Sequence, residues 1–319
     1  MDLQEIKILE LFGGIGAPKK ALINLGIPHK SIDYVEIDEK AVRTYNSMFK
    51  EHLIYKTQDI RAWDLKPNIL VHGSPCQDFS IAGKQKGADE GSETRSSLMW
   101  ETLRIIDNMG VWKPQVVIWE NVKNVLSKHM KRNFDKYIEE MEKLGYTSSF
   151  EILNAMDFGI PQKRERVFTI SILGDKKFDF KKLEKRPLQN LKDFLSDEYE
   201  AHHIVSQRTM LERLENNPNF SSVGFQGKVK ILKDFAYTIT TKQMRCPNSG
   251  VIALDDGRYR YLTEKECWRL MGFDDEDFER ALKEHPGKKG FQNGTLYKQA
   301  GNSIVVQVLE AIFKVILEM

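Results

Sequence analysis

The stretch Ile6-Lys7-Ile8-Leu9-Glu10-Leu11-Phe12-Gly13-Gly14-Ile15-Gly16 decides the fold class of this 319-residue chain. Its apolar part, residues 6–12, predicts a buried strand, and its glycines predict a turn into a helix. Pro18 falls near the first turn of that helix and Gly26 just past its end, where these residue types are preferred. Glycines let a backbone approach a ligand closely, although a tight turn without a ligand explains the same residues.

The alternation of strand and helix continues to about residue 173. Further strands are predicted at 32–37, 68–72, 116–119 and 166–172. Three helices are predicted between them. The first begins after an N-cap at Asp38, the second covers 96–109, and the third runs from Phe134 to a C-cap at Gly145. Strands that alternate with amphipathic helices predict an α/β fold with a doubly wound, mostly parallel sheet.

After Gly174 this rhythm is lost, and short runs rich in Ser, Asn, Gly and Pro predict a smaller, irregular or β-rich second domain. A helix at 262–273 is expected to begin with a capping box made by Thr263 and Glu266. The apolar helix at 303–317 is expected to pack back onto the first domain. The predicted division is therefore 1–175 plus 291–319 for the first domain and 176–290 for the second.

The composition, 41% apolar and 29% charged, is typical of a soluble globular protein, and the net charge of +2 does not by itself indicate nucleic acid. No continuous apolar run of about 18 residues is present, and residues 1–5 lack the features of a secretory signal, so no membrane association is expected. The three cysteines, Cys76, Cys246 and Cys267, form no CxxC pair. This pattern predicts a reducing, cytoplasmic compartment and no metal site.

Acidic residues follow two of the early extended segments. Glu36 ends the second strand, where an acid can accept both hydroxyls of a ribose. Asp59-Ile60 follows a short extended stretch at 53–55 and is placed to bind an adenine edge. Lys19 stands where a dinucleotide fingerprint has its third glycine, which counts against NAD. Each acid alone is commonly a solvated loop residue, but together they indicate an adenosine-containing cofactor without a pyrophosphate.

A second cluster of candidates surrounds Cys76, which follows the strand at 68–72 in a turn. Most cysteines are inert, but polar neighbours and free backbone amides favour the thiolate. His72 is expected to point into the sheet or to be hydrogen-bonded there, whereas Glu120 ends the next strand beside Cys76. Arg164 and Arg166 lie two apart at a strand start and suit a carbonyl oxygen or a phosphate; a charge-protected edge strand is the alternative.

Five motifs in order make the chain similar to the DNA (cytosine-5)-methyltransferase family of the bacterial and bacteriophage restriction-modification type. They are Phe12 to Gly16, Gly73-Ser74-Pro75-Cys76-Gln77, Glu120-Asn121-Val122, Gln162 to Arg166, and Gln299-Ala300-Gly301-Asn302-Ser303. Residues 260–273 resemble the family's penultimate motif. The resemblance spans almost the whole chain except about 175–258, which is the variable target-recognition region of the family. Glu10, where Asp is usual, and Ala17-Pro18 depart from the pattern.

The resemblance implies a Rossmann-like, S-adenosylmethionine-dependent methyltransferase. Cys76 would add to carbon 6 of a flipped-out cytosine, Glu120 would bond ring nitrogen 3 and the amine, and Arg166 with Arg164 would hold the base carbonyl and the active-site loop. The residues expected to line the cofactor site are Phe12, Gly14, Ile15, Gly16, Glu36, Ile37, Asp59, Ile60, Asn302 and Ser303. The mobile loop from Gln77 to Gly91, with Ser80, Lys84 and Lys86, would close over DNA.

The resemblance also implies duplex DNA as the partner, with a separately acting restriction endonuclease as a second candidate, and a monomer close to the nucleoid. Basic stretches at 176–186 and 228–233 would meet phosphates. Base-edge readers are predicted at Thr240, Lys242, Gln243 and Arg245, where an ordinary surface loop is the alternative. Three rival functions remain at this point: a tRNA cytosine-5 methyltransferase, a catalytically silent DNA-binding regulator and a nicotinamide oxidoreductase.

Overall fold

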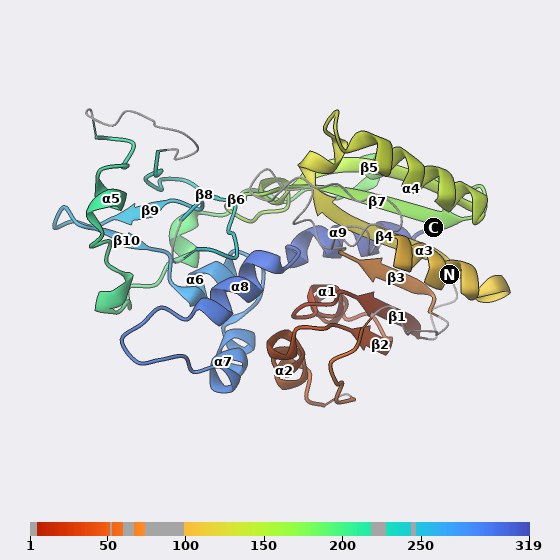
Figure 1. Ribbon diagram of the computed structural model, residues 1–319, viewed down its shortest axis with the longest axis horizontal. Coiled ribbons are helices and arrows are strands. Elements are labelled where there is room, and N and C mark those ends of the chain that lie inside the picture. Colours follow the sequence, from red (N-terminus) through yellow and green to blue (C-terminus); the bar gives the residue numbers. More distant parts are fainter. Residues whose placement is uncertain (1–4, 52, 60–66, 74–98, 218–227, 244–246) are drawn as a thin grey trace.

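A computed structural model describes residues 5–51, 53–59, 67–73, 99–217, 228–243 and 247–319 (Figure 1). Its centre is a six-stranded sheet in the order β2-β1-β3-β4-β7-β5. The strands of this sheet are β1 (Ile6–Leu11), β2 (His29–Val35), β3 (Ile69–His72), β4 (Val116–Val122), β5 (Tyr146–Asn154) and β7 (Glu165–Leu173). The α/β fold predicted from the alternation of strands and helices is confirmed.

The direction of the strands divides the sheet into two parts. β2, β1, β3 and β4 are parallel to their neighbours, whereas β7 is antiparallel to both β4 and β5. The sequence analysis missed β5, and it did not predict that β7 would run opposite to the others. β4 is also longer than expected, because Glu120 and Asn121 continue the ladder with β7 instead of leaving it.

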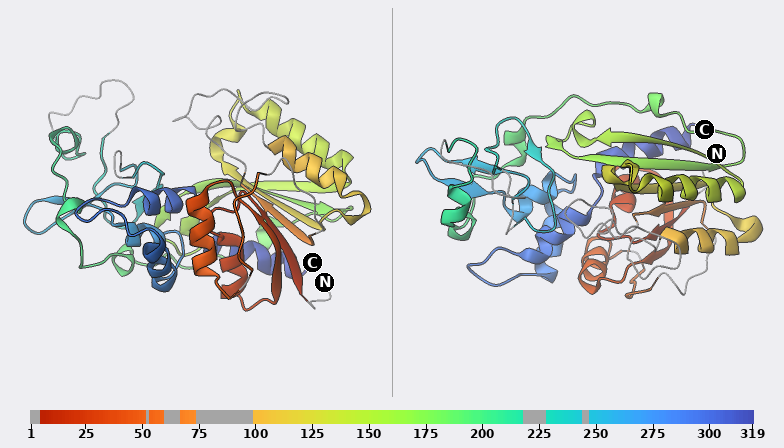
Figure 2. Two further views of the ribbon diagram at one scale, coloured as in Figure 1. Left: turned by 60° about the horizontal axis from the view of Figure 1, so that its bottom comes forward. Right: turned by 45° about the horizontal axis from the view of Figure 1, so that its top comes forward.

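Helices cover both faces of the sheet, as Figure 2 shows. One face packs on α1 (Ala17–Asn24), α2 (Glu39–Met48) and α9 (Val306–Leu317), and the other on α3 (Met99–Asn108) and α4 (Lys131–Lys143). Strands that are buried on both faces have nearly continuous apolar sequences. β3, Ile69–His72, is such a strand, and all four of its residues are buried. α9 packs against α1, which confirms that the C-terminal helix returns to the first half of the chain.

Local signals set the helix ends as expected. The Asp38 side chain accepts a hydrogen bond from the amide of Lys40 at the start of α2. Pro18 lies in the first turn of α1, and Gly26, with a φ of 63°, follows its end. The capping box of Thr263 and Glu266 opens α6 (Glu264–Arg269).

The region after β7 contains little regular structure. Its elements among the described residues are α5 (Arg208–Leu211), β8 (Ala236–Tyr237), β9 (Val251–Ala253), β10 (Tyr259–Tyr261), α6, α7 (Asp275–Glu284) and α8 (Gly294–Asn302). β9 pairs with β10, and β8 pairs with β6 (Gln162–Lys163), which precedes β7. α7 packs on α2. The expectation of a smaller, irregular or β-rich region is met, while the division into two domains stays a prediction.

One segment in the described part of the chain, Gly294–Leu317, is long and apolar enough to cross a membrane by length and composition alone. It comprises α8 and α9, and 67% of its most apolar window is buried inside the protein. Burial of this kind is also found in the core helices of soluble proteins.

Candidate active site and cofactor site

The candidate residues meet at one edge of the central sheet. The carboxyl ends of β1, β2, β3 and β4 lie at this edge because these strands are parallel. β7 runs the other way, so its first residues lie there too, with Arg166 opposite Val122 in the ladder. Open α/β sheets bind ligands at the carboxyl ends of their strands.

The glycine turn after β1 leaves room for a ligand at one position. Gly14 has a φ of +53°, and a Cβ placed on it would meet no atom within 4 Å. A Cβ on Gly16, by contrast, would lie 2.6 Å from the ring of Tyr45. The Tyr34 hydroxyl donates a hydrogen bond to the Gly14 carbonyl at 2.5 Å. Gly16 therefore serves packing, whereas Gly14 borders open space.

Glu36 lies directly beside this turn. Its carboxylate accepts hydrogen bonds from the amides of Gly14 at 3.0 Å, Ile37 at 2.8 Å and Asp38 at 2.9 Å. Burial raises the pKa of this carboxyl group, and the three amides oppose the rise. The Ile37 side chain next to it is 68% exposed. An acid beside an open glycine turn and an exposed apolar side chain fit the ribose and the base of an adenosine.

Two other segments approach the same turn. The amide of Gln58 donates to the Glu36 carbonyl at 2.9 Å, which places Asp59 next to Glu36; Ile60 lies outside the described residues. Lys298 on α8 forms an ion pair with Asp38 at 2.5 Å. α8 ends at Asn302, with Ser303 as its C-cap. The tertiary structure thus brings the C-terminal motif toward the predicted cofactor turn.

Glu120 is the acid on β4, close to the end of β3 that leads to Cys76. A Cβ on Gly73, which follows β3, would lie 3.7 Å from Glu120 Oε2. Arg166 Nε lies 3.1 Å from Glu120 Oε1. Burial raises the pKa of Glu120, and the positive charges of Arg166 and Arg164 oppose the rise. Cys76, Gln77, Ser80, Lys84 and Lys86 lie outside the described residues.

His72 is not available as a base at this edge. It is fully buried, and its Nε2 lies 3.0 Å from the Tyr137 hydroxyl. Burial lowers the pKa of His72 to about 3. Of the two predicted environments, the structure shows a histidine that is hydrogen-bonded in the core, to Tyr137 of α4.

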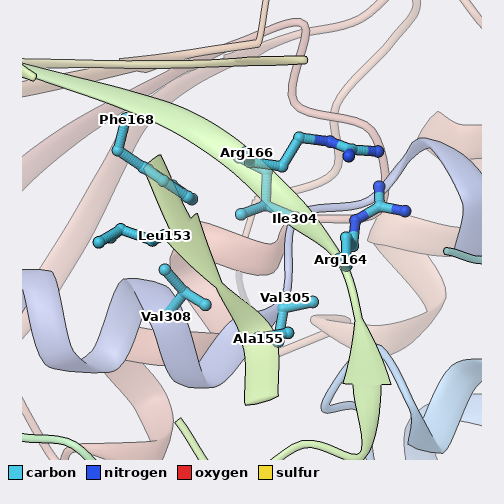
Figure 3. A pocket seen from close by; sticks show the side chains of 8 residues that line it. All are labelled: Leu153, Ala155, Arg164, Arg166, Phe168, Ile304, Val305 and Val308. Atoms are coloured by element: carbon cyan, nitrogen blue, oxygen red, sulfur yellow. The ribbon is translucent and has the colours of Figure 1, made fainter. Parts of the chain in front are cut away.

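The structure places the side chain of Arg164 against backbone carbonyls. Figure 3 shows both arginines extending to the same side from the start of β7. Arg164 is 4% exposed, and its guanidinium donates to the carbonyls of Ile239, Gly301 and Ser303 at 2.9, 3.1 and 2.8 Å. Because Nη1 and Nη2 donate to carbonyls within the protein, the expectation that Arg164 holds the base is corrected to a role in positioning backbone. The active-site loop, which Arg164 was also expected to hold, lies outside the described residues.

A small apolar pocket lies against these two arginines (Figure 3). Its lining residues are Leu153, Ala155, Arg164, Arg166, Phe168, Ile304, Val305 and Val308. Arg166, which pairs with Glu120, therefore borders this pocket.

Two predictions for DNA contact are also corrected. Gln243 is fully buried and donates to the Ser249 hydroxyl, so its side chain is not exposed for reading a base edge. Lys242 is exposed and Thr240 is half-buried, while Arg245 lies outside the described residues. In the basic stretch at 176–186, Arg186 pairs with Glu310 on α9 at 2.6 Å. Arg186 therefore takes part in packing within the protein and not in binding phosphate.

One group of potential metal ligands exists in the described part of the chain: His202, His203 and Glu264, whose ligand atoms lie within 4.8 Å of one another. His203 Nδ1 accepts the amide hydrogen of Glu200, and its Nε2 lies 2.9 Å from Glu264. In this tautomer Nε2 carries the proton and donates it to the carboxylate. The arrangement satisfies His203 without an ion.

The sequence analysis assigned no role to Gln162, which is also fully buried. Its amide donates to the Leu270 carbonyl and accepts from the amide of Ile239. The signal was present in the motif Gln162 to Arg166, but a motif does not show which partner a side chain meets.

The sheet, the acid beside the glycine turn and the Glu120–Arg166 pair define an α/β protein with an adenosine-type cofactor site next to a buried carboxyl group. The family model described as C-5 cytosine-specific DNA methylase matches residues 6–318, so the chain belongs to that family. It is a DNA (cytosine-5)-methyltransferase, and its family depends on S-adenosylmethionine.

Two relatives are similar over nearly their whole lengths. The type II methyltransferase M2.ScrFI of Lactococcus lactis subsp. cremoris is 34% identical, covering 97% of this chain and 98% of the relative. The type II methyltransferase M.HhaI of Haemophilus parahaemolyticus is 32% identical, covering 98% and 94%. Among solved structures, the Dnmt2 methyltransferase of S. pombe has a TM-score of 0.74 at 20% identity, covering 98% of both chains. That structural likeness supports the fold alone.

Proposed function

We propose that this enzyme methylates a cytosine turned out of duplex DNA within a short recognised sequence, through a transient bond between Cys76 and the base. The observation that carries the proposal is the Glu120–Arg166 pair beside Gly73, three residues before Cys76. A base seated there would meet a carboxyl group and a guanidinium in the plane of its polar edge.

The proposed chemistry uses the residues of this edge in turn. The Cys76 thiolate adds to carbon 6, and the electron pair released at carbon 5 takes up the methyl group. Removal of the carbon 5 proton then expels the thiolate and restores the ring. Glu120, whose pKa is raised by burial, bonds ring nitrogen 3 and the exocyclic amine of the base, and Arg166 binds the base carbonyl.

S-adenosylmethionine supplies the methyl group when it is bound, and the residues present fit it. The open side of Gly14, the Glu36 carboxylate and the exposed Ile37 would hold its adenosine. The further residues proposed for this site are Phe12, Ile15, Gly16, Asp59, Ile60, Asn302 and Ser303.

DNA recognition is proposed for the second domain, residues 176–290, with Thr240 and Lys242 closest to the bases. We further propose that the enzyme acts as a monomer in the cytoplasm, at the nucleoid, beside a separately acting restriction endonuclease. The relatives named type II methyltransferases support that last assignment.

The test is methyl transfer from labelled S-adenosylmethionine by the wild type and by Cys76→Ser. Wild type is expected to label duplex DNA at least a hundred-fold faster than tRNA, and Cys76→Ser to lose about four orders of magnitude in rate while still binding S-adenosylhomocysteine. Cys267→Ser is the matched control, because Cys267 is a buried cysteine far from Cys76 in the sequence. Methylation by Cys76→Ser at the wild-type rate contradicts the covalent mechanism, and preference for tRNA contradicts the substrate.

A further inference from the structure

The peptide of Ile239 is bonded on both sides by residues next to the active site. Gln162 Oε1 accepts its amide hydrogen at 3.1 Å, and Arg164 Nη1 donates to its carbonyl at 2.9 Å. Ile239 is fully buried. Nearby, the Thr238 hydroxyl donates to the Lys163 carbonyl, and β6 pairs with β8. The chain just before Thr240 is therefore fixed to the start of β7.

Gly301 lies against the peptide that joins the next two residues, Thr240 and Thr241. A Cβ on Gly301 would lie 2.4 Å from the carbonyl carbon of Thr240 and 2.4 Å from the nitrogen of Thr241. These are backbone atoms, which cannot rotate away as the end of a side chain can. Only a residue without a Cβ lets α8 approach so closely. Arg164 joins both sides, because it donates to the carbonyls of Ile239 and Gly301.

The same anchor serves the base site. Arg164 precedes Arg166 by two residues, and Arg166 pairs with Glu120 at 3.1 Å. The distance between the flipped cytosine and the segment containing Thr240 and Lys242 is thus set through one short piece of chain. A shift of that segment would misplace its contacts with DNA without changing the reacting groups.

We propose that Gln162, Arg164 and Gly301, which we call the Ile239 clamp, are positioning residues that fix the register between sequence reading and the cytosine site. This inference rests on the proposed function. The clamp acts on the selectivity for DNA sequence and on the KM for DNA, and it leaves the chemical step unchanged. It predicts that small changes here relax recognition, because each lost or misplaced base contact costs roughly ten-fold in discrimination.

The test compares Arg164→Lys and Gly301→Ala with wild type on a randomised duplex library, read by bisulfite sequencing. Alanine normally favours a helix over glycine, so harm at Gly301 would come from the crowded backbone. Arg280→Lys is the matched control, because Arg280 also donates to a backbone carbonyl, that of Met48 at the end of α2, at 2.6 Å. Binding of S-adenosylhomocysteine to each variant is measured separately, as the rise in Tm that this compound causes.

Both clamp variants are expected to raise the KM for DNA, or to lower the ratio of cognate to one-base-changed methylation, by roughly ten-fold. Their kcat should stay within about three-fold and their thermal shift should persist, while Arg280→Lys matches wild type. Unchanged KM and selectivity in both variants, or a fall in kcat alone, would overturn the clamp. If wild type methylates no duplex DNA, the proposed function fails, and the clamp fails with it. If wild type methylates duplex DNA and both clamp variants match it in KM and selectivity, the clamp alone fails.

Discussion

Glu10 is an acid enclosed in the protein beneath the cofactor turn. Its side chain is 1% exposed and accepts a hydrogen bond from the Tyr45 hydroxyl at 2.7 Å. Burial raises the pKa of Glu10 to about 7, while Tyr45 and the charge of Lys19 oppose the rise. Lys19 is also buried, with its ammonium over the rings of Tyr45 and Phe49. The lysine that counted against a dinucleotide thus belongs to the support of the turn.

The raised pKa of Glu10 makes stability depend on pH. Between pH 4.5 and about 7 the carboxyl group is protonated in the folded protein and ionised in the unfolded chain, so stability falls as pH rises through this window. The separation of the two values corresponds to about 3 kcal/mol. Glu10→Gln should remove that part of the slope, as measured by denaturant unfolding at pH 4.5 to 8. The exposed Glu151→Gln is the control, and an unchanged slope in Glu10→Gln contradicts the assignment.

Predictions for single residues succeeded where the local sequence decides the environment. His72 lies inside a short apolar strand, and Asp38 precedes a helix, so burial and capping followed from neighbours in the chain. Gln243 was assigned wrongly because its complete burial depends on tertiary packing, although its partner Ser249 is only six residues away. The base-binding role of Arg164 was assigned wrongly because its partners come from distant segments. Ile239 lies 75 residues from Arg164, and no spacing in the sequence signals such a contact.

At the scale of elements, a buried ion pair joins β10 to α6. Arg260 Nη1 and Nη2 each lie 2.8 Å from a carboxylate oxygen of Glu266, and both side chains are nearly fully buried. Glu266 also accepts the amides of Thr263 and Ser196. The pair therefore connects the capping box of α6 with the chain at Ser196.

Removing one partner of this pair should be costly. Glu266→Ala leaves the Arg260 guanidinium buried without its counter-charge, which costs about 3–5 kcal/mol of unfolding free energy. Denaturant unfolding measures it. Glu276→Ala removes an exposed partner of Arg280 and should cost less than about 1 kcal/mol. Similar losses in the two variants would show that the buried pair contributes no more than a surface pair.

Element types were easier to predict than strand directions. Apolar runs and capping residues identified β1, β3, β4 and β7 and the helices between them, and they identified β2 with bounds shifted from 32–37 to His29–Val35. β5 was missed because its sequence, residues 146–154, mixes polar and apolar side chains and its burial does not alternate. It is an edge strand, so only one neighbour and part of one face shape its composition.

For the molecule as a whole, ligand binding should appear as stability. A compound that binds only the folded protein at a hundred times its Kd adds about 2.7 kcal/mol. S-adenosylhomocysteine is expected to raise the Tm, and NAD is not. Glu36→Ala should lose most of that rise, whereas Glu39→Ala, an exposed residue of α2, should keep it. Stabilisation of the wild type by NAD instead would contradict the cofactor proposal.

The sequence by itself determined the strand–helix alternation, the glycine turn, the acid that follows β2 and the acid near the end of β4, because periodicity and strand ends are local properties. The tertiary structure decided which of these groups meet. β7 runs antiparallel to β4, and this direction brings Arg166 to the edge of the sheet where Glu120 lies near the end of β4. The partners of Arg164 and Gly301 were decided in the same way, because contacts between residues far apart in the chain depend on how the whole sheet and its covering segments pack.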